Sequence, residues 1–186
     1  MINLKLFFTL LLLVSLNGCI SSQSYYVLSM ASQPKNVYND AKKTIGVEKV
    51  VVPHYLYKRE IAIAKSSNQI TLLNNALWGE DLDDGLTQRL ISFLQKKFNQ
   101  PHVYGYPWGV ERQPHLKVTV HITRFIAQGN YIYLDANWEV THLQTQKRKA
   151  KLFSTKVPTS KTPDSIVSAM DKAFGELEEA IASGIR

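Results

Sequence analysis

The sequence predicts one α+β domain: a two-layer sandwich in which a mixed, largely antiparallel sheet has two main amphipathic helices packed on one face. Residues 116–122 and 132–140 alternate strictly between apolar and polar side chains, which is typical of strands with one buried face. Residues 82–98 and 163–181 carry apolar side chains at helical spacing, so each helix has one face to bury. Covering the apolar face of the sheet with these helices gives the two layers.

Composition limits the class of protein. The chain has 186 residues, a net charge of +7 and a single cysteine. Its 45% hydrophobic and 20% charged residues exclude a disordered or fibrous chain, and its length suits one domain. One cysteine excludes an intrachain disulfide and every metal site built from several thiolates.

The first 18 residues form a hydrophobic leader. Lys5 precedes an apolar run at 6–16, which is shorter than the roughly 20 residues of a membrane-spanning helix and is typical of a signal peptide. The leader ends at Gly18, directly before Cys19, and this arrangement resembles the lipobox of bacterial lipoproteins. In that class the signal is cut before the cysteine, the thiol receives a diacylglycerol and the new amine is acylated. The alternative is an ordinary secretory signal that leaves Cys19 as a free thiol.

We therefore divide the chain into a lipoprotein signal peptide at 1–18, a lipidated tether at 19–24 and a single domain at 25–186. In bacterial lipoproteins an aspartate just after the cysteine retains the protein at the inner membrane. Ile20 stands there instead, so the resemblance implies the periplasmic face of the outer membrane of a Gram-negative cell.

The N-terminal part of the domain contains short strand candidates. We predict strands at 25–28 and 45–52, a loop at 29–44, and a hairpin that pairs 61–64 with 69–73. The hairpin turn is predicted at 66–68, because Asn68 tolerates the left-handed conformation that tight turns use.

Both helices have recognisable ends. Acidic residues crowd the start of the first helix, and Lys96 and Lys97 lie near its end, which is the order that the helix dipole favours. The acids lack the spaced ligands of a calcium loop, so we predict helix capping rather than a cation site. The second helix opens at Thr162-Pro163, a capping residue followed by a proline in the first turn. We expect its charged residues on the face opposite its apolar stripe; they are Asp171, Lys172, Glu176 and Glu179.

The strands between the helices form the best-specified pair. With a turn at 128–130, Val120 faces Trp138 across an antiparallel hairpin. A slip by one residue would set apolar against polar side chains along the whole pair, so the register is well specified. We expect 150–157 to add a further strand to this sheet.

The search for catalytic chemistry is negative. The five histidines lack metal-ligand spacing, and the sequence has no nucleophile elbow, phosphate-binding loop or dinucleotide fingerprint. Lipid attachment would consume the only thiol. We therefore predict no catalytic residue, no metal site, no enzyme activity and no cofactor other than the diacylglycerol and N-acyl chain on Cys19.

A basic segment at 147–161 contains no acidic residue; its basic residues are Lys147, Arg148, Lys149, Lys151, Lys156 and Lys161. Behind a secretion signal we expect no nucleic acid as a partner. An acidic protein partner or an anionic membrane surface fits this charge. An edge strand whose lysines face water and prevent aggregation fits it equally well.

The order and spacing of several motifs resemble the ABC-type transport auxiliary lipoproteins across almost the whole mature chain. The matching stretches are Tyr25-Tyr26-Val27-Leu28, Ile45-Gly46-Val47, Val52-Pro53-His54-Tyr55-Leu56, Glu60-Ile61, Trp78 to Thr87, Tyr106-Pro107-Trp108, Pro114, Leu116 to Phe125 and Leu134 to Trp138. Two turn positions depart from the family pattern: Tyr57-Lys58-Arg59 replaces Asp-Arg-Pro, and Asp81 replaces a proline.

The resemblance implies a non-catalytic, outer-membrane-anchored periplasmic subunit of an MCE-type intermembrane lipid transport system, in which it docks the MCE-domain protein. Through that protein it would connect to an inner-membrane permease or a PqiA-like protein, and members of the family form homo-oligomeric rings. The alternative is an outer-membrane lipoprotein that activates a cell-wall synthase or another envelope-assembly factor; a secreted hydrolase with an unrecognised site is a further one.

The candidate partner-binding residues are Trp78, Trp108, Lys147, Arg148, Lys149 and Lys151. The tryptophans are chosen because aromatic side chains anchor interfaces. Packing of the helix onto the sheet is the alternative role for both.

Overall fold

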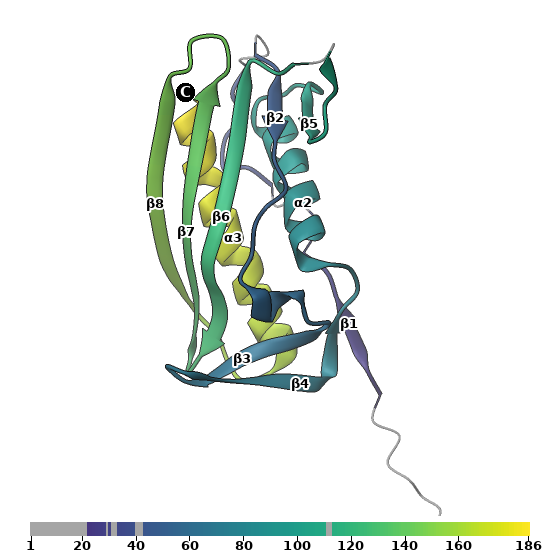
Figure 1. The fold of residues 1–186 in the computed structure, drawn as a ribbon. Coiled ribbons are helices and arrows are strands. Elements are labelled where there is room, and N and C mark those ends of the chain that lie inside the picture. The colour runs from purple at the N-terminus through teal and green to yellow at the C-terminus, as the bar shows by residue number, and fades with distance from the viewer. Residues whose placement is uncertain (1–21, 29, 31–32, 40–42, 111–112) are drawn as a thin grey trace, which may run out of the picture.

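The computed structural model describes residues 22–28, 30, 33–39, 43–110 and 113–186. These residues form an eight-stranded mixed sheet with both long helices on one face, which confirms the predicted α+β sandwich (Figure 1). In chain order the elements are β1 (Ser24–Tyr26), β2 (Ile45–Val47), the 3-10 helix η1 (His54–Tyr57), β3 (Glu60–Ser66), β4 (Gln69–Trp78), α2 (Leu82–Lys97), β5 (Val103–Gly105), β6 (Leu116–Gln128), β7 (Tyr131–His142), β8 (Arg148–Pro158) and α3 (Pro163–Ile185).

The β6–β7–β8 meander contains the longest strands of the sheet and ends at the edge strand β8, and both of its pairings are antiparallel. Val120 pairs with Trp138 in the predicted register, and both side chains are buried in the core. The turn is one residue tighter than predicted, because β6 extends to Gln128 and Gly129 supplies the positive φ of 61° that the turn requires. Trp138 also lies over Gly184 of α3, where a Cβ atom would come within 2.3 Å of the indole ring.

The opposite edge of β6 is shared between two other strands. β2 pairs in parallel with its beginning, at Leu116 to Val118, and β3 pairs in parallel with its end, at Ala127 and Gln128. A register shift between Ile122 and Arg124 marks a β-bulge between these two contacts. Such a bulge bends a strand and changes which face each following side chain occupies.

The predicted strand at 45–52 is shorter in the structure, where β2 ends at Val47 and a single parallel bridge forms at Val51. The ladder is interrupted because the N–H of Val50 bonds to the side chain of Thr87 on α2, 2.9 Å away. The predicted hairpin is confirmed as β3 and β4, whereas η1 and β5 were not predicted.

β1 adds to the outer edge of β4 as a parallel strand. The Tyr26 hydroxyl donates to the Asp164 carboxylate at 2.9 Å, which raises the pKa of Tyr26 and joins β1 to the first turn of α3. At that end of α3, Thr162 caps the helix as predicted, accepting from the Ser165 N–H.

The start of α2 is stabilised differently from the prediction. Asp81 occupies the N-cap position, but its side chain makes no capping hydrogen bond. Asp83 and Asp84 instead pair with Lys49, at 2.9 Å and 2.7 Å.

Two buried cations on α2 join the helices to each other. Arg89 is fully buried, donates to Glu178 at 3.3 Å and 3.2 Å, and pairs with Asp171. Lys97 is equally buried and pairs with Glu179 at 2.7 Å. Asp171 and Glu179, which we expected on the face opposite the apolar stripe, therefore form ion pairs with α2.

Candidate functional site

Gly18 and Cys19, the predicted cleavage and lipidation residues, lie outside the described residues. The described chain begins at Ser22, and β1 starts two residues later. Figure 1 places β1 beside the β3–β4 hairpin at one end of the molecule, with β5 and the start of β8 at the other. We call the end that carries β1 the β1 end and the opposite end the distal end.

The two candidate tryptophans occupy different environments. Trp78 is 2% exposed and belongs to the core, which is the packing role given as its alternative. Trp108 is half-buried at the distal end, where it packs on Gly46 so closely that a Cβ atom there would lie 2.9 Å from the ring. Tyr106 meets Trp108 edge-on with 5.0 Å between ring centroids, and both Tyr106 and Val110 are largely exposed.

The candidate basic residues also lie at the distal end, but strand alternation separates them. Lys149 and Lys151 pair with the inward-facing Val140 and Trp138, whereas Arg148 lies on the outer face, 4.0 Å from Glu139. The Lys149 Nζ donates to the carbonyl of Ser183 at 3.4 Å, so this lysine places a positive charge at the C-terminus of α3. All four basic residues are exposed, and they extend over both faces of this end.

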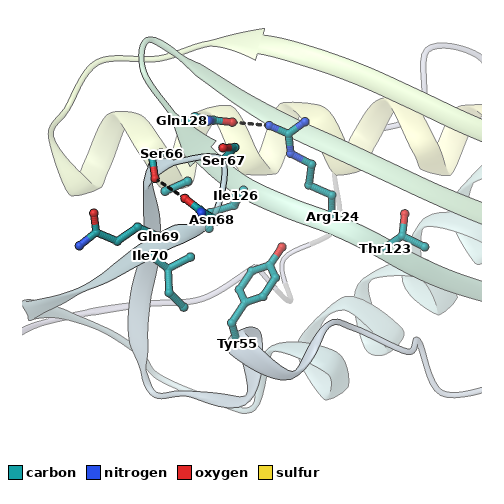
Figure 2. Close-up of a pocket in the computed structure, with 11 residues that line it drawn as sticks. Tyr55, Ser66, Ser67, Asn68, Gln69, Ile70, Thr123, Arg124, Ile126 and Gln128 are labelled. Carbon is teal, nitrogen blue, oxygen red and sulfur yellow. Dashed lines mark hydrogen bonds between the residues drawn. The ribbon is translucent and has the colours of Figure 1, made fainter.

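A hollow of about 600 Å³ lies at the β1 end, between the β3–β4 hairpin and the last residues of β6 (Figure 2). Ile70 and Ile126 give it apolar walls, and Ile126 is buried on this outer side of the sheet. Its volume lies within the range of about 300–1,000 Å³ that small-molecule sites occupy. The further lining residues are Tyr55, Ala64, Ser66, Ser67, Asn68, Gln69, Thr123, Arg124 and Gln128.

Among the described residues, Arg124 is the one charged residue that lines this hollow. Its guanidinium stacks on the Tyr133 ring at 4.0 Å and donates to Gln128 at 2.6 Å, so it leans over the hollow toward the hairpin turn (Figure 2). The Asp135 carboxylate lies 3.9 Å from the Arg124 guanidinium and balances part of the positive charge of Arg124. Since a guanidinium has five N–H donors, these contacts leave donors for a further acceptor.

Tyr55 lies beneath the hollow, and its hydroxyl points into it (Figure 2). The oxygen accepts from the Phe125 N–H at 3.0 Å. Burial raises the pKa of Tyr55, more than its bond to Phe125 lowers it, so the hydroxyl keeps its proton and remains a hydrogen-bond donor.

Sequence reasoning missed Arg124 and Tyr55. A signal was present, because strict alternation along β6 would put Arg124 on the helix-facing side, where an unpaired charge is unfavourable. The bulge resolves this conflict by pairing Arg124 with Asp135 and returning Phe125 to the core.

No group of three or more His, Cys, Asp or Glu in the described chain is placed to hold a metal ion. Of the helices in the described residues, none is long and apolar enough to cross a membrane.

Comparison with known proteins gives both the fold and the family. Two solved structures have the same fold. One is an uncharacterized protein that is 22% identical, with a TM-score of 0.73 and coverage of 89% of this chain and 99% of its own. The other is a Xanthomonas campestris protein that is 14% identical, with a TM-score of 0.72 and coverage of 87% of this chain and 95% of its own. The intermembrane transport lipoproteins PqiC of Escherichia coli (strain K12) and Shigella flexneri are each 28% identical over 92% of both chains.

The family model of the ABC-type transport auxiliary lipoprotein component matches residues 26–182. This match includes β6, the bulge and both helices, and it extends over most of the chain. The chain therefore belongs to the family of ABC-type transport auxiliary lipoproteins.

Proposed function

We propose that this protein is a non-catalytic subunit of an intermembrane lipid transport system. Anchored through Cys19 at the periplasmic face of the outer membrane, it docks an MCE-domain protein, which in turn connects to an inner-membrane permease or a PqiA-like protein. Membership of the family supports this proposal, as does the similarity to proteins named as intermembrane transport lipoproteins.

The observation that carries the proposal is the separation of the two ends of the domain. Cys19 is three residues before Ser22, so a fully extended chain allows at most about 11 Å between them. The distal end lies at the far end of the 13-residue strand β6, about 40 Å away at ~3.3 Å per residue. An anchor at Cys19 thus leaves the distal end directed away from the membrane.

The distal end has the side chains of a protein interface. Tyr106 is 64% exposed and Val110 is 89% exposed, so binding a partner there would remove apolar surface from water. The lysines at the start of β8 are separated from β5 by four strand spacings, or about 19 Å. Their positive charge favours an acidic partner. A membrane anchor raises the local concentration of the protein, so each contact need not be strong.

Crosslinking in intact cells with the full-length lipoprotein tests this function. We expect an MCE-domain protein as the captured partner, and we expect Val110→Asp to reduce its yield. Leu152→Asp is the matched control, since Leu152 is also 89% exposed but projects from the outer face within β8. Capture of a cell-wall synthase and no MCE-domain protein would make the alternative function the better account.

The charge contribution is tested separately with purified partner. Replacing Lys147, Arg148, Lys149 and Lys151 by Gln should slow association and flatten its salt dependence, because steering by exposed charges acts on the association rate. An unchanged rate would return these residues to the role of a solvated strand edge.

A further inference from the structure

We propose that the hollow between the β3–β4 hairpin and β6 binds the phosphate headgroup of a phospholipid. The proposal deepens the transport function above, on which its biological meaning rests. It depends on the chemistry of the lining and on where the hollow lies in the fold.

The polar part of the lining suits a phosphate. Arg124 is the one charged residue among the described lining residues; Tyr133 and Gln128 hold its guanidinium, and the Asp135 carboxylate beside it, 3.9 Å away, neutralises only part of its charge. Arginine binds phosphate oxygens through paired N–H donors, and prior fixation of the side chain lowers the entropy lost on binding. The Tyr55 hydroxyl is a second donor that points into the same space (Figure 2). Ser66 and Ser67 of the hairpin turn also line the hollow, although the Ser66 hydroxyl already donates to the Asn68 side chain at 3.0 Å.

The apolar part of the lining makes a purely polar ligand a poor fit. Ile70 is 46% exposed at the hollow, and Ile126 and Ala64 line it as well. A free phosphate would leave these apolar surfaces in water, whereas the glycerol and first methylenes of a lipid would cover them. One cation beside apolar walls therefore matches an anionic headgroup with an apolar stem.

The position of the hollow agrees with a ligand that comes from a membrane. β4 lines the hollow with its first residues and pairs with β1 through its last three, and β1 begins five residues after Cys19. A lipid anchor on Cys19 would hold this end of the domain near the headgroups of the membrane. The hollow and the docking surface would then lie at opposite ends of β6.

Binding is tested with a soluble chain that begins at Ser22, since all described elements lie within 22–186. The probe is dihexanoyl phosphatidylglycerol below its micelle concentration, followed by backbone-amide NMR. We expect saturable shifts confined to residues 64–70 and 123–128. Inorganic phosphate and octyl glucoside serve as the separate polar and apolar arms, and each should bind at least tenfold more weakly.

Two variants identify the recognition chemistry. Arg124→Gln keeps a hydrogen-bonding side chain but removes the charge, and it should weaken lipid binding about tenfold or more, because a charged hydrogen bond is lost. Lys117→Gln is the control, as Lys117 is on the same strand and is also paired with a carboxylate, Glu48 at 3.0 Å. Ile70→Glu places a negative charge at an exposed position of the wall, which reduces the risk of unfolding, and it should weaken binding similarly.

The possible results of these experiments test lipid binding independently of the docking function. Phosphate binding as tight as lipid binding would show a site for a free anion and overturn the lipid assignment. Equal binding of octyl glucoside, or no effect of either variant, would reduce the hollow to a nonspecific apolar surface. Because no partner protein is present, a negative result here leaves the docking function intact, and failed docking leaves lipid binding intact.

Discussion

The buried ion pair between α2 and α3 makes a quantitative prediction about stability. Arg89 has no exposed surface, and two of its N–H groups donate to the equally buried Glu178. Replacing Arg89 by Met removes one partner of a buried pair, which typically costs about 3–5 kcal/mol. The total stability of a domain is only about 5–15 kcal/mol, so this variant should lose a large fraction of it.

The assay is urea unfolding followed by tryptophan fluorescence, because Trp78 and Trp138 are buried and report on the core. At about 2 kcal/mol per molar urea, the midpoint should fall by roughly 2 M. The double variant Arg89→Met with Glu178→Leu should recover much of the loss, since well-packed apolar residues often replace buried ion pairs without cost.

The control is an ion pair at the surface, Lys117 with Glu48, whose side chains are 29% and 38% exposed. Lys117→Met should cost about 0–1 kcal/mol, because water already solvates both charges. If Arg89→Met costs no more than Lys117→Met, or if the two replacements in the double variant simply add, then the pair does not hold the helices together.

Three further predictions concern single contacts, each measured by urea unfolding. Burial acts to raise the pKa of Glu179, but hydrogen bonds from the Lys97 side chain and the Lys35 backbone N–H outweigh it and hold the pKa below its ordinary value. Stability should therefore fall as pH drops through that lowered pKa, and Glu179→Gln should flatten the fall; an unchanged pH profile would contradict this. Gly46→Ala should cost about 1–3 kcal/mol by forcing a Cβ against the Pro114 ring at 2.6 Å and the Trp108 ring at 2.9 Å, and unaltered stability would show that both rings move freely. Thr87→Val should cost about 1–3 kcal/mol because the buried Val50 N–H loses its acceptor, whereas Thr87→Ser retains it; equal stability of the two variants would argue against that bond.

Periodicity was enough to predict the meander and both helices. The register around Val120 and Trp138 follows from alternation, because a slip would bury polar side chains. Thr162 and Pro163 mark the start of α3 for a similarly local reason, since capping depends on adjacent residues.

The hollow could not be predicted in the same way, because it depends on long-range packing. It forms where the hairpin turn meets the end of β6, and residues such as Asn68 and Arg124 are far apart in sequence. The buried partners Arg89 and Glu178 present the same difficulty, because charged residues on helices usually face water. Tertiary contacts decide which charges are buried, and one sequence does not reveal those contacts.

The shared edge of β6 also determines the order in which the chain can assemble. β6, β7, β8 and α3 follow one another directly and meet through mostly local contacts, which form quickly. β2 is synthesised about seventy residues before the strand it joins, and β3 likewise waits for the end of β6. During synthesis β1, β4 and β3 can pair with one another, and β2 can pair with β5, but neither group joins the rest of the sheet until β6 follows. We therefore expect the C-terminal half to fold first, so a chain that crosses a membrane from its N-terminus would remain incompletely folded until nearly all of it has passed through.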